Sequence, residues 1–355
     1  MSGPDPTAPP QWTTGLVQTP VGSVHQVSTT LSRADHMGTI KVRLNLGRMT
    51  YSVPPGLYAV GNPTEASLVF VSANYKLSFD TLRRNLRTLD AWILVLDTKG
   101  VNVWCAAGKG TFSTDELVHR IDVTELARIV SHRRLILPQL GAPGVAAHAV
   151  KQRSGFKVVY GPVRADDIQE FIAGDLKATP EMRRVRFDLP DRLVLIPVEM
   201  AQWGRYTLLL MAILLLLGGL HRGGYDPSRV LDRGLRSALL LFASYVGSVT
   251  LFPILLPWLP GRAFSIRGCI LGVILAIGAL AVGALSWQGL PATIEAASWF
   301  LLIPTMGAFV ALNYTGTTTF TSQSGVFREM KFALPLQITG AVAGLGGWIA
   351  SGFLS

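Results

Sequence analysis

Cys105 is the residue of this sequence best suited to chemistry. It is one of only two cysteines in 355 residues, and it lies in the stretch VNVWCAAGKGTF at 101–112, between a tryptophan and a run of small residues. Alanine and glycine place no bulky side chain beside the thiol, so a flat reactant can approach it closely. The alternative is structural, because a free cysteine often packs as a small buried apolar residue. Spacing alone does not choose between these two roles.

Three further loops are expected at the same edge of a sheet as the cysteine. Ligands of parallel α/β sheets bind at the carboxyl ends of the strands, and each of these loops follows a predicted strand. A planar cofactor resting on this edge would contact all four segments. Taken singly, each loop is equally consistent with an ordinary turn. The candidate contacts in the three loops are Ser72, Ala73 and Asn74, then Gly141 and Gly144, then Tyr160 and Gly161.

Two common kinds of site are not supported by the residues present. The phosphate-loop pattern G-x-x-x-x-G-K-S/T would require glycine at Val103 and serine or threonine at Gly110, so the sequence fails it twice. An iron–sulfur cluster needs about four thiolates, and the chain has only Cys105 and Cys269. Cys269 lies in an apolar run, so a structural disulfide is not expected. Any low-potential electron must therefore come from a partner.

Strands alternate with helices between residues 50 and 175, which indicates an α/β fold with a mostly parallel sheet and right-handed crossovers. A short strand at 101–105 is expected to deliver the Cys105 motif. Residues 113–130 predict two short helices or one broken helix, with Ser113 as a cap. Further strands are expected within 67–72, 91–97, 134–140 and 156–162, and helices within 78–86, 145–153 and 164–174.

The first 49 residues are expected to form a tail and a hairpin. Residues 1–35 are rich in Pro, Ser, Thr and Gly and contain no apolar stretch long enough for a signal peptide. We therefore expect a mobile segment that is not translocated. The alternation in TIKVRLNLGRMTYSV, residues 39–53, predicts a hairpin with Gly47 near its turn.

The C-terminal part of the chain is predicted to span a membrane. Mean hydropathy is +0.37 and only 15% of the residues are charged. After a basic connector at 176–205, an all-α transmembrane domain of about five helices is expected at 206–355. The first apolar run is short unless 193–200 extends it. The five runs cover 206–220, 237–258, 266–287, 293–313 and 332–354.

The net charge of +10 does not indicate a nucleic-acid partner, because the basic residues form no stripe interleaved with aromatics. Five arginines before the first apolar run are better suited to anionic lipid. The balance of positive charge favours a multi-pass protein of the cell inner membrane with the α/β domain in the cytoplasm. The loop at 222–236 opposes this orientation with four arginines. The five arginines are Arg183, Arg184, Arg186, Arg192 and Arg205.

Residues 102–109, NVWCAAGK, resemble the cap-helix motif of the mercury-methylating corrinoid proteins, the HgcA family, without a mismatch. The resemblance extends to a Rossmann-like corrinoid-binding domain at 50–175 followed by a hydrophobic C-terminal half. It implies a corrinoid cofactor (cobalamin, methylcobalamin) with Cys105 as both the catalytic residue and the ligand to cobalt. The other motif residues implied to bind the cofactor are Asn102, Val103, Trp104, Ala106, Ala107, Gly108 and Lys109.

The same resemblance implies a membrane-anchored methyltransferase. A methyl donor of the folate one-carbon pathway would supply the methyl group, and inorganic Hg(II) would accept it to form methylmercury. A ferredoxin-like protein with two 4Fe–4S clusters would act as electron donor, and the lipid bilayer would hold the chain.

Two other functions remain open. The soluble domain also resembles the corrinoid domain of the large subunit of the corrinoid iron–sulfur protein, a methyl carrier of acetyl-CoA synthesis. That family has a barrel domain and a four-cysteine segment upstream, which this chain lacks. The other possibility is a non-catalytic membrane protein that binds cobalamin. The apolar runs contain few ionisable residues besides Glu295, and a transport path usually needs more.

Overall fold

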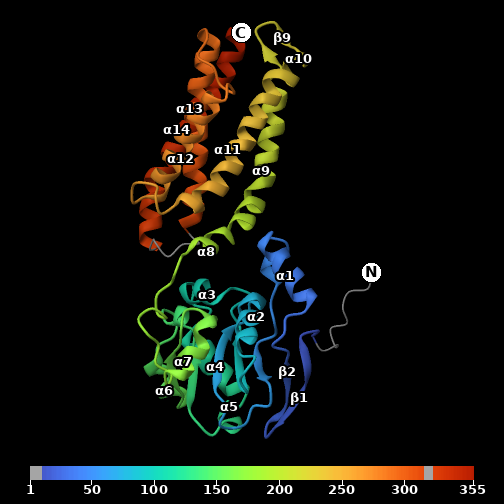
Figure 1. Ribbon diagram of the computed structural model, residues 1–355, viewed down its shortest axis with the longest axis vertical. Coiled ribbons are helices and arrows are strands. Elements are labelled where there is room, and N and C mark those ends of the chain that lie inside the picture. The colour runs from blue at the N-terminus through green and yellow to red at the C-terminus, as the bar shows by residue number, and fades with distance from the viewer. Residues whose placement is uncertain (1–9, 316–322) are drawn as a thin grey trace. The chain divides into compact units, whose positions relative to one another are not determined.

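The computed structural model describes residues 10–315 and 323–355. Internal contacts divide the chain into two compact units, one of Met1–Val42 with Leu46–Val185 and one of Arg43–Asn45 with Arg186–Ser355. The first unit is an α/β domain and the second consists of helices, five of them apolar and long (Figure 1). This confirms the fold class predicted from the sequence.

A seven-stranded mixed sheet forms the centre of the first unit, in the order β1-β2-β3-β5-β4-β6-β7. Strands β4, β5, β6 and β7 run parallel, so their carboxyl ends meet at one edge. β3 is antiparallel to β5. The strands are β1 Thr13–Thr19, β2 Gly22–Val27, β3 Gly56–Val60, β4 Val69–Ala73, β5 Ala91–Leu96, β6 Arg134–Leu137 and β7 Lys157–Tyr160.

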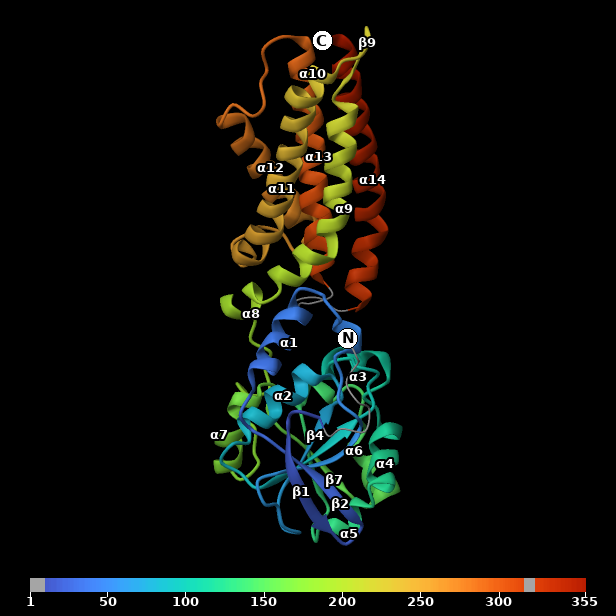
Figure 2. The ribbon, with the colours of Figure 1, turned by 90° about the vertical axis from the view of Figure 1, so that its right-hand side faces the viewer.

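Helices cover both faces of this sheet because its central strands are apolar on both sides. Val71 and Leu94 belong to a core shared with α3, α4, α5 and α6, while Phe70 and Ile93 face a second core beneath α2 and α7 (Figure 2). The helices are α1 Arg33–Arg43, α2 Lys76–Asn85, α3 Val103–Lys109, α4 Thr114–Val123, α5 Leu126–Ile129, α6 Ala147–Ser154 and α7 Ile168–Ala173. Short 3₁₀ turns occur at Arg48–Thr50 (η1), Gln139–Gly141 (η2) and Ala165–Asp167 (η3).

The N-terminal region differs from the expected tail and hairpin. Residues 13–27 form β1 and β2, because β2 pairs with β3 and Trp12 packs on Phe79 with ring centroids 5.1 Å apart. The predicted tail over 1–9 lies outside the described residues. The hairpin predicted at 39–53 is wrong, since α1 occupies its first part and η1 its second. The alternating Ile40 and Val42 instead lie on the exposed and the buried side of α1.

The short strand expected at 101–105 is also wrong. Strand β5 ends at Leu96, a turn follows, and α3 begins at Val103. Asn102 accounts for this difference, because its side chain accepts the backbone N–H of Cys105 at 2.9 Å and so starts a helix.

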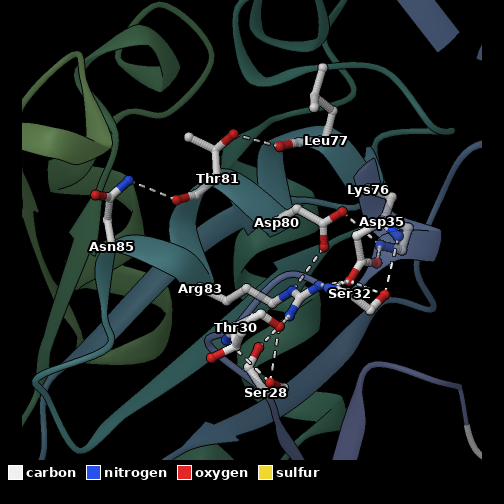
Figure 3. Close-up of polar contacts among 10 residues, drawn as sticks. All are labelled: Ser28, Thr30, Ser32, Asp35, Lys76, Leu77, Asp80, Thr81, Arg83 and Asn85. Carbon is white, nitrogen blue, oxygen red and sulfur yellow. Dashed lines mark hydrogen bonds and ion pairs between the residues drawn. The ribbon is translucent and has the colours of Figure 1, made fainter. Parts of the chain in front are cut away.

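A buried cluster of two carboxylates and two cations ties α1 to α2 (Figure 3). Lys76 Nζ donates to Asp35 at 2.5 Å and to Asp80 at 2.6 Å. Arg83, which is fully buried, donates to the same two carboxylates at 2.9 and 2.8 Å. The four charges balance, so the cluster leaves no unpaired charge in the interior.

Asp35 contributes stability that depends on pH. Burial raises the pKa of Asp35, but hydrogen bonds from Lys76 and Ser32 outweigh burial and hold the pKa well below the usual value of 3.8. A carboxylate with a depressed pKa stabilises the fold above its unfolded pKa, near pH 4. This stabilisation is lost as the pH falls through the pKa of the folded state.

Five helical segments of the second unit are long and apolar enough to cross a membrane within the described residues. They cover Leu189–Leu217, Pro227–Leu255, Phe264–Ala281, Leu290–Tyr314 and Gly325–Leu354. The first run does gain residues from before position 206, because α9 extends over Ile196–Leu217. The other elements are α8 Leu189–Leu193, β8 Leu220–His221, β9 Gly224–Tyr225, α10 Pro227–Arg229, the π-helix η4 Val230–Gly234, α11 Leu235–Leu255, α12 Phe264–Ala281, α13 Leu290–Tyr314 and α14 Gln323–Leu354.

Glycines allow three of these helices to pack at close range. A Cβ on Gly268 or Gly272 would overlap the backbone of α13, at Gly307 and Pro304 respectively. A Cβ on Gly344 of α14 would lie 3.0 Å from a carbonyl oxygen of α13. Small residues at such positions let helix backbones approach in lipid.

Arg233 is a buried charged residue of the second unit. Its side chain pairs with Glu295 at 3.4 Å, donates to Ser351 Oγ at 2.9 Å and lies over the ring of Trp348, 4.3 Å from the centroid. Arg236 also pairs with Glu295, at 3.2 Å. Glu295 therefore offsets one of the four arginine charges that opposed the predicted orientation, and it shares its carboxylate between Arg233 and the half-exposed Arg236.

Replacing Asp35 by asparagine tests the buried ion cluster. Lys76 and Arg83 would each lose one carboxylate, and we expect a local destabilisation of about 3 kcal/mol. Amide hydrogen exchange of the full chain over residues 28–35 should become faster. The control is Asp166→Asn, which breaks an exposed pair with Arg84 at 3.6 Å. Its effect should be about 0–1 kcal/mol. If the amides at 28–35 of Asp35→Asn exchange as slowly as in the wild type, the stabilising role assigned to the buried ion cluster is contradicted.

Candidate functional site

The motif around Cys105 forms the short helix α3, and both of its ends are fixed by the motif's own residues. At the start, Asn102 caps the helix through the Cys105 N–H. At the end, Gly110 adopts the left-handed conformation with φ 78°, which favours glycine. The N–H groups of Thr111 and Phe112 then turn back to the Ala106 carbonyl at 3.0 and 3.2 Å.

The two faces of α3 have different roles. Val103, Ala106 and Ala107 are buried in the core on the sheet side. Trp104 and Cys105 are half-buried, and Gly108 and Lys109 are exposed. The two alanines were expected to shape a cofactor contact, but their side chains belong to the core.

Cys105 and Gly108 lie three residues apart and therefore share one face of the helix. A Cβ added to Gly108 would meet nothing within 4 Å, so the space beside the thiol is open. Cys105 forms no disulfide. Cys105 is thus partly exposed on the face of α3 that does not pack in the core.

Asn74 positions the turn that leads into α3. Its Oδ1 accepts three hydrogen bonds, from the backbone N–H and the hydroxyl of Thr98 at 3.1 and 2.8 Å and from the Gly100 N–H at 2.9 Å. Thr98 is fully buried and Asn74 nearly so. Asn74 was predicted to contact a cofactor, but its carbonyl oxygen is committed to this turn.

Charged side chains stabilise the turn between β5 and α3. Asp97 accepts hydrogen bonds from the side chain and the backbone N–H of Lys99 and donates its own N–H to Glu116 at 2.8 Å. Burial raises the pKa of Asp97, but the hydrogen bonds from Lys99 outweigh it, so the pKa lies below its usual value. Asp97 therefore stays ionised and keeps the turn ordered at neutral pH.

The loop at 141–144 packs directly against α3. A Cβ on Gly144 would overlap the Phe112 carbonyl oxygen and lie 3.1 Å from the Ala107 Cα. A Cβ on Gly141 would meet the Phe112 ring. The loop is held by Thr114, which donates its N–H to the Gly144 carbonyl at 3.1 Å and accepts the Ala146 N–H at 2.9 Å.

The other predicted residues stabilise the carboxyl edge of the sheet and the loop at 141–144. Ser72 and Ala73, at the end of β4, are buried. Tyr160 donates its hydroxyl hydrogen to the Val145 carbonyl at 2.6 Å, and Gly161 continues the pairing with β6 through the Leu137 carbonyl. The structure thus brings the loop at 141–144 to the motif, while these residues hold the sheet edge and the loop.

Sequence reasoning missed Thr98, Phe112 and Thr114 as positioning residues. Thr98 carries a readable signal, since it lies just after a buried apolar strand and two residues before a glycine, where a turn is expected. Among residues 10–315 and 323–355, no three His, Cys, Asp or Glu side chains come together as a metal site. A metal at this edge would therefore take fewer than three such ligands from the described residues.

Two glycine substitutions test separately the close packing on the inner face of α3 and the open space on its outer face. Gly144→Ala should push the loop at 141–144 away from α3, because the new methyl group overlaps backbone atoms that cannot yield. Gly108→Ala should fold normally and stabilise α3 by about 1 kcal/mol, since alanine is a better helix former. Amide hydrogen exchange over 103–114 should be faster in the first variant and unchanged or slower in the second. The reverse order would contradict the packing described for the two faces.

Part of this chain is similar to subunits of complexes named for acetyl-CoA synthesis and breakdown. Residues 27–172 match the family described as the CO dehydrogenase/acetyl-CoA synthase delta subunit. The gamma subunit of the acetyl-CoA decarbonylase/synthase complex of Archaeoglobus fulgidus is 30% identical over 141 residues, which cover 38% of this chain and 30% of that protein. The gamma subunits of Methanopyrus kandleri and Methanocaldococcus jannaschii are 31% and 32% identical over 127 residues, covering 35% of this chain and 27% and 26% of theirs.

The chain spans less than a third of the length of these curated relatives, and the similarity lies in its α/β unit. The comparisons therefore confirm the expected relation to a corrinoid-binding family. They do not confirm the resemblance to the mercury-methylating proteins. Residues 27–172 form a domain related to the corrinoid proteins of acetyl-CoA synthesis.

Proposed function

We propose that this protein is a membrane-anchored, corrinoid-dependent methyltransferase that forms methylmercury from inorganic Hg(II). The observation that carries the proposal is the partly exposed Cys105 beside Gly108 on the outer face of α3. The corrinoid class rests on the related family, and the choice of Hg(II) rests on the motif at 102–109.

The residues present fit a corrinoid. A large planar group needs an open, nearly flat surface, and Gly108, Lys109 and Gly110 are exposed beside the thiol. Neither Gly108 nor Gly110 would bring a Cβ within 4 Å of any neighbour, so the backbone can be approached. Cys105 would hold the cobalt, and the outer face of α3 would border the ring. Cobalamin, in its methylated form, would supply the methyl group to be transferred.

The polarity of the transfer favours a thiolate at this position. Hg(II) is an electrophile, so a methyl group that reaches it must bring the bonding electron pair. A thiolate donates more electron density to a metal than a neutral imidazole does. Cys105 would therefore favour release of the methyl group with its electron pair, and the fixed ends of α3 would hold its sulfur in place.

A second candidate is a methyl carrier of the acetyl-CoA pathway, and the comparisons favour it. The relatives are named as subunits of acetyl-CoA decarbonylase/synthase complexes, and these names do not mention mercury. The two functions share the methyl donor and the cofactor and differ in the acceptor. A direct assay with each acceptor separates them.

Either function needs partners. A folate-type methyl donor of the one-carbon pathway would reload the cofactor. Within the described residues, two free cysteines provide too few thiolates for a cluster, so electrons would come from a ferredoxin-like protein with two 4Fe–4S clusters. Five apolar helices support residence in the inner membrane.

Exchange of each cysteine in turn tests the proposal. In Cys105→Ala, the absorption spectrum of the corrinoid-loaded full chain should shift, and methylmercury formation should fall by at least about tenfold, a loss of roughly 1.4 kcal/mol or more in transition-state stabilisation. The matched control is Cys269→Ala, which removes the exposed cysteine of α12 and should leave spectrum and product unchanged.

Three outcomes are informative. Undiminished methylmercury and an unchanged spectrum in Cys105→Ala would remove the thiolate from the mechanism. Transfer to Hg(II) by the wild type that is lost in Cys105→Ala would support mercury as the substrate. Transfer by the wild type to the methyl acceptor of an acetyl-CoA decarbonylase/synthase complex, with none to Hg(II), would establish the second candidate.

The membrane topology gives a separate prediction. The α/β unit should face the cytoplasm and Ser355 the opposite side, because five spans separate them and positive charge precedes the first span. Arg233 and Arg236, on the opposing side, are paired with Glu295. Reporter fusions at both ends measure this directly. Both reporters active on the same side would show that one of the five segments does not span.

A further inference from the structure

We infer that α1 and the segment after it form a surface that lies on the lipid bilayer. Large apolar residues of α1 lie on its outer side. Met37 and Ile40 of α1, and Leu44 directly after it, follow helical spacing and are 53%, 50% and 42% exposed. The residues of α1 that are buried are Asp35 and Val42. A helix of a water-exposed domain has the opposite arrangement.

This outward orientation is fixed by strong contacts. Asp35 is held by Lys76, Arg83 and Ser32, so the first turn of α1 cannot rotate without breaking the buried ion cluster (Figure 3). A Cβ on Gly38 would lie within 2.8 Å of the Tyr51 ring, so this part of the helix lies close against its own unit. The apolar face is therefore presented by a fixed helix.

The apolar surface continues beyond the helix and is flanked by positive charge. Leu46 and Met49 are 60% and 70% exposed. Asp35 is the single acidic residue in this stretch, and it is already paired. Apolar side chains with interspersed cations are typical of segments that lie in the interface of anionic membranes. The basic residues of the stretch are Arg33, Lys41, Arg43 and Arg48.

The bilayer is the occupant that these observations favour over a protein. The same chain has five helices long and apolar enough to span a membrane, so a lipid surface is an occupant that the chain itself supplies. Four cations and one neutralised carboxylate match the negative charge of that surface. The inference does not depend on which cofactor or acceptor the protein uses.

The segment after α1 also lies next to the turn that leads into α3. The carbonyl oxygen of Met49 lies next to Gly100, where a Cβ would approach it to 3.1 Å. Gly100 belongs to the turn held by Asn74 before α3. The segment on the bilayer would therefore be joined directly to the turn that positions Cys105.

Spin labels at single introduced cysteines test this surface in the full chain. The background carries Cys105→Ala and Cys269→Ala, and the protein is placed in nanodiscs of phosphatidylcholine with phosphatidylglycerol. Labels are attached in Met37→Cys, Ile40→Cys and Leu44→Cys. The control is Lys151→Cys on α6, an exposed residue of the same unit. Collision rates are measured with oxygen, which enters lipid, and with a nickel chelate, which stays in water.

The ratio of oxygen to nickel collisions should be several-fold higher at positions 37, 40 and 44 than at position 151. Adding Ile40→Asp and Leu44→Asp should lower the ratio at position 37 to that of the control. If the ratio at position 37 without the aspartate substitutions equals that at position 151, the surface lies in water and the inference is overturned. Low collision rates with both reagents would show cover by protein and would also overturn it.

Discussion

Close packing of α3 against the sheet and the loop at 141–144 depends on the small side chains of Ala106 and Ala107. Ala106 is fully buried and Ala107 nearly so, and the Gly144 backbone touches the same turn. A larger residue at any of these positions would displace the helix or the loop. Because the small residues face inward, the helix can present only its other face to a ligand. Cys105 lies on that outer face.

Polar contacts then fix where this outer face lies. Asn74 holds the turn before the helix, Asn102 starts the helix and Gly110 ends it. Each of these contacts involves backbone groups that would otherwise be left without a hydrogen bond. A seven-residue helix gains little stability from its own hydrogen bonds, so its position depends on these caps and on packing. The same principle applies in the helical unit, where Gly268 and Gly272 allow α12 to approach α13.

The sequence predicted those elements whose signals are local. Strands β4 and β5 are continuous apolar runs, and Ser113 was correctly expected to cap a helix, where it accepts the Glu116 N–H. Strands β1 to β3 could not be predicted in this way, because their stability comes from pairing between residues distant in the chain. Helix α1 was missed because its buried residues are few and one of them is an aspartate. For the site, the motif was found from residue types, but the division between inward alanines and outward cysteine required the structure.

The most direct measurement is X-ray absorption at the cobalt edge of the full-length protein loaded with corrinoid. A sulfur atom from Cys105 in the first coordination shell is the expected result, because this residue is partly exposed on the outer face of α3 and no other described cysteine lies in this unit. A first shell of nitrogen and oxygen alone would contradict the role assigned to Cys105.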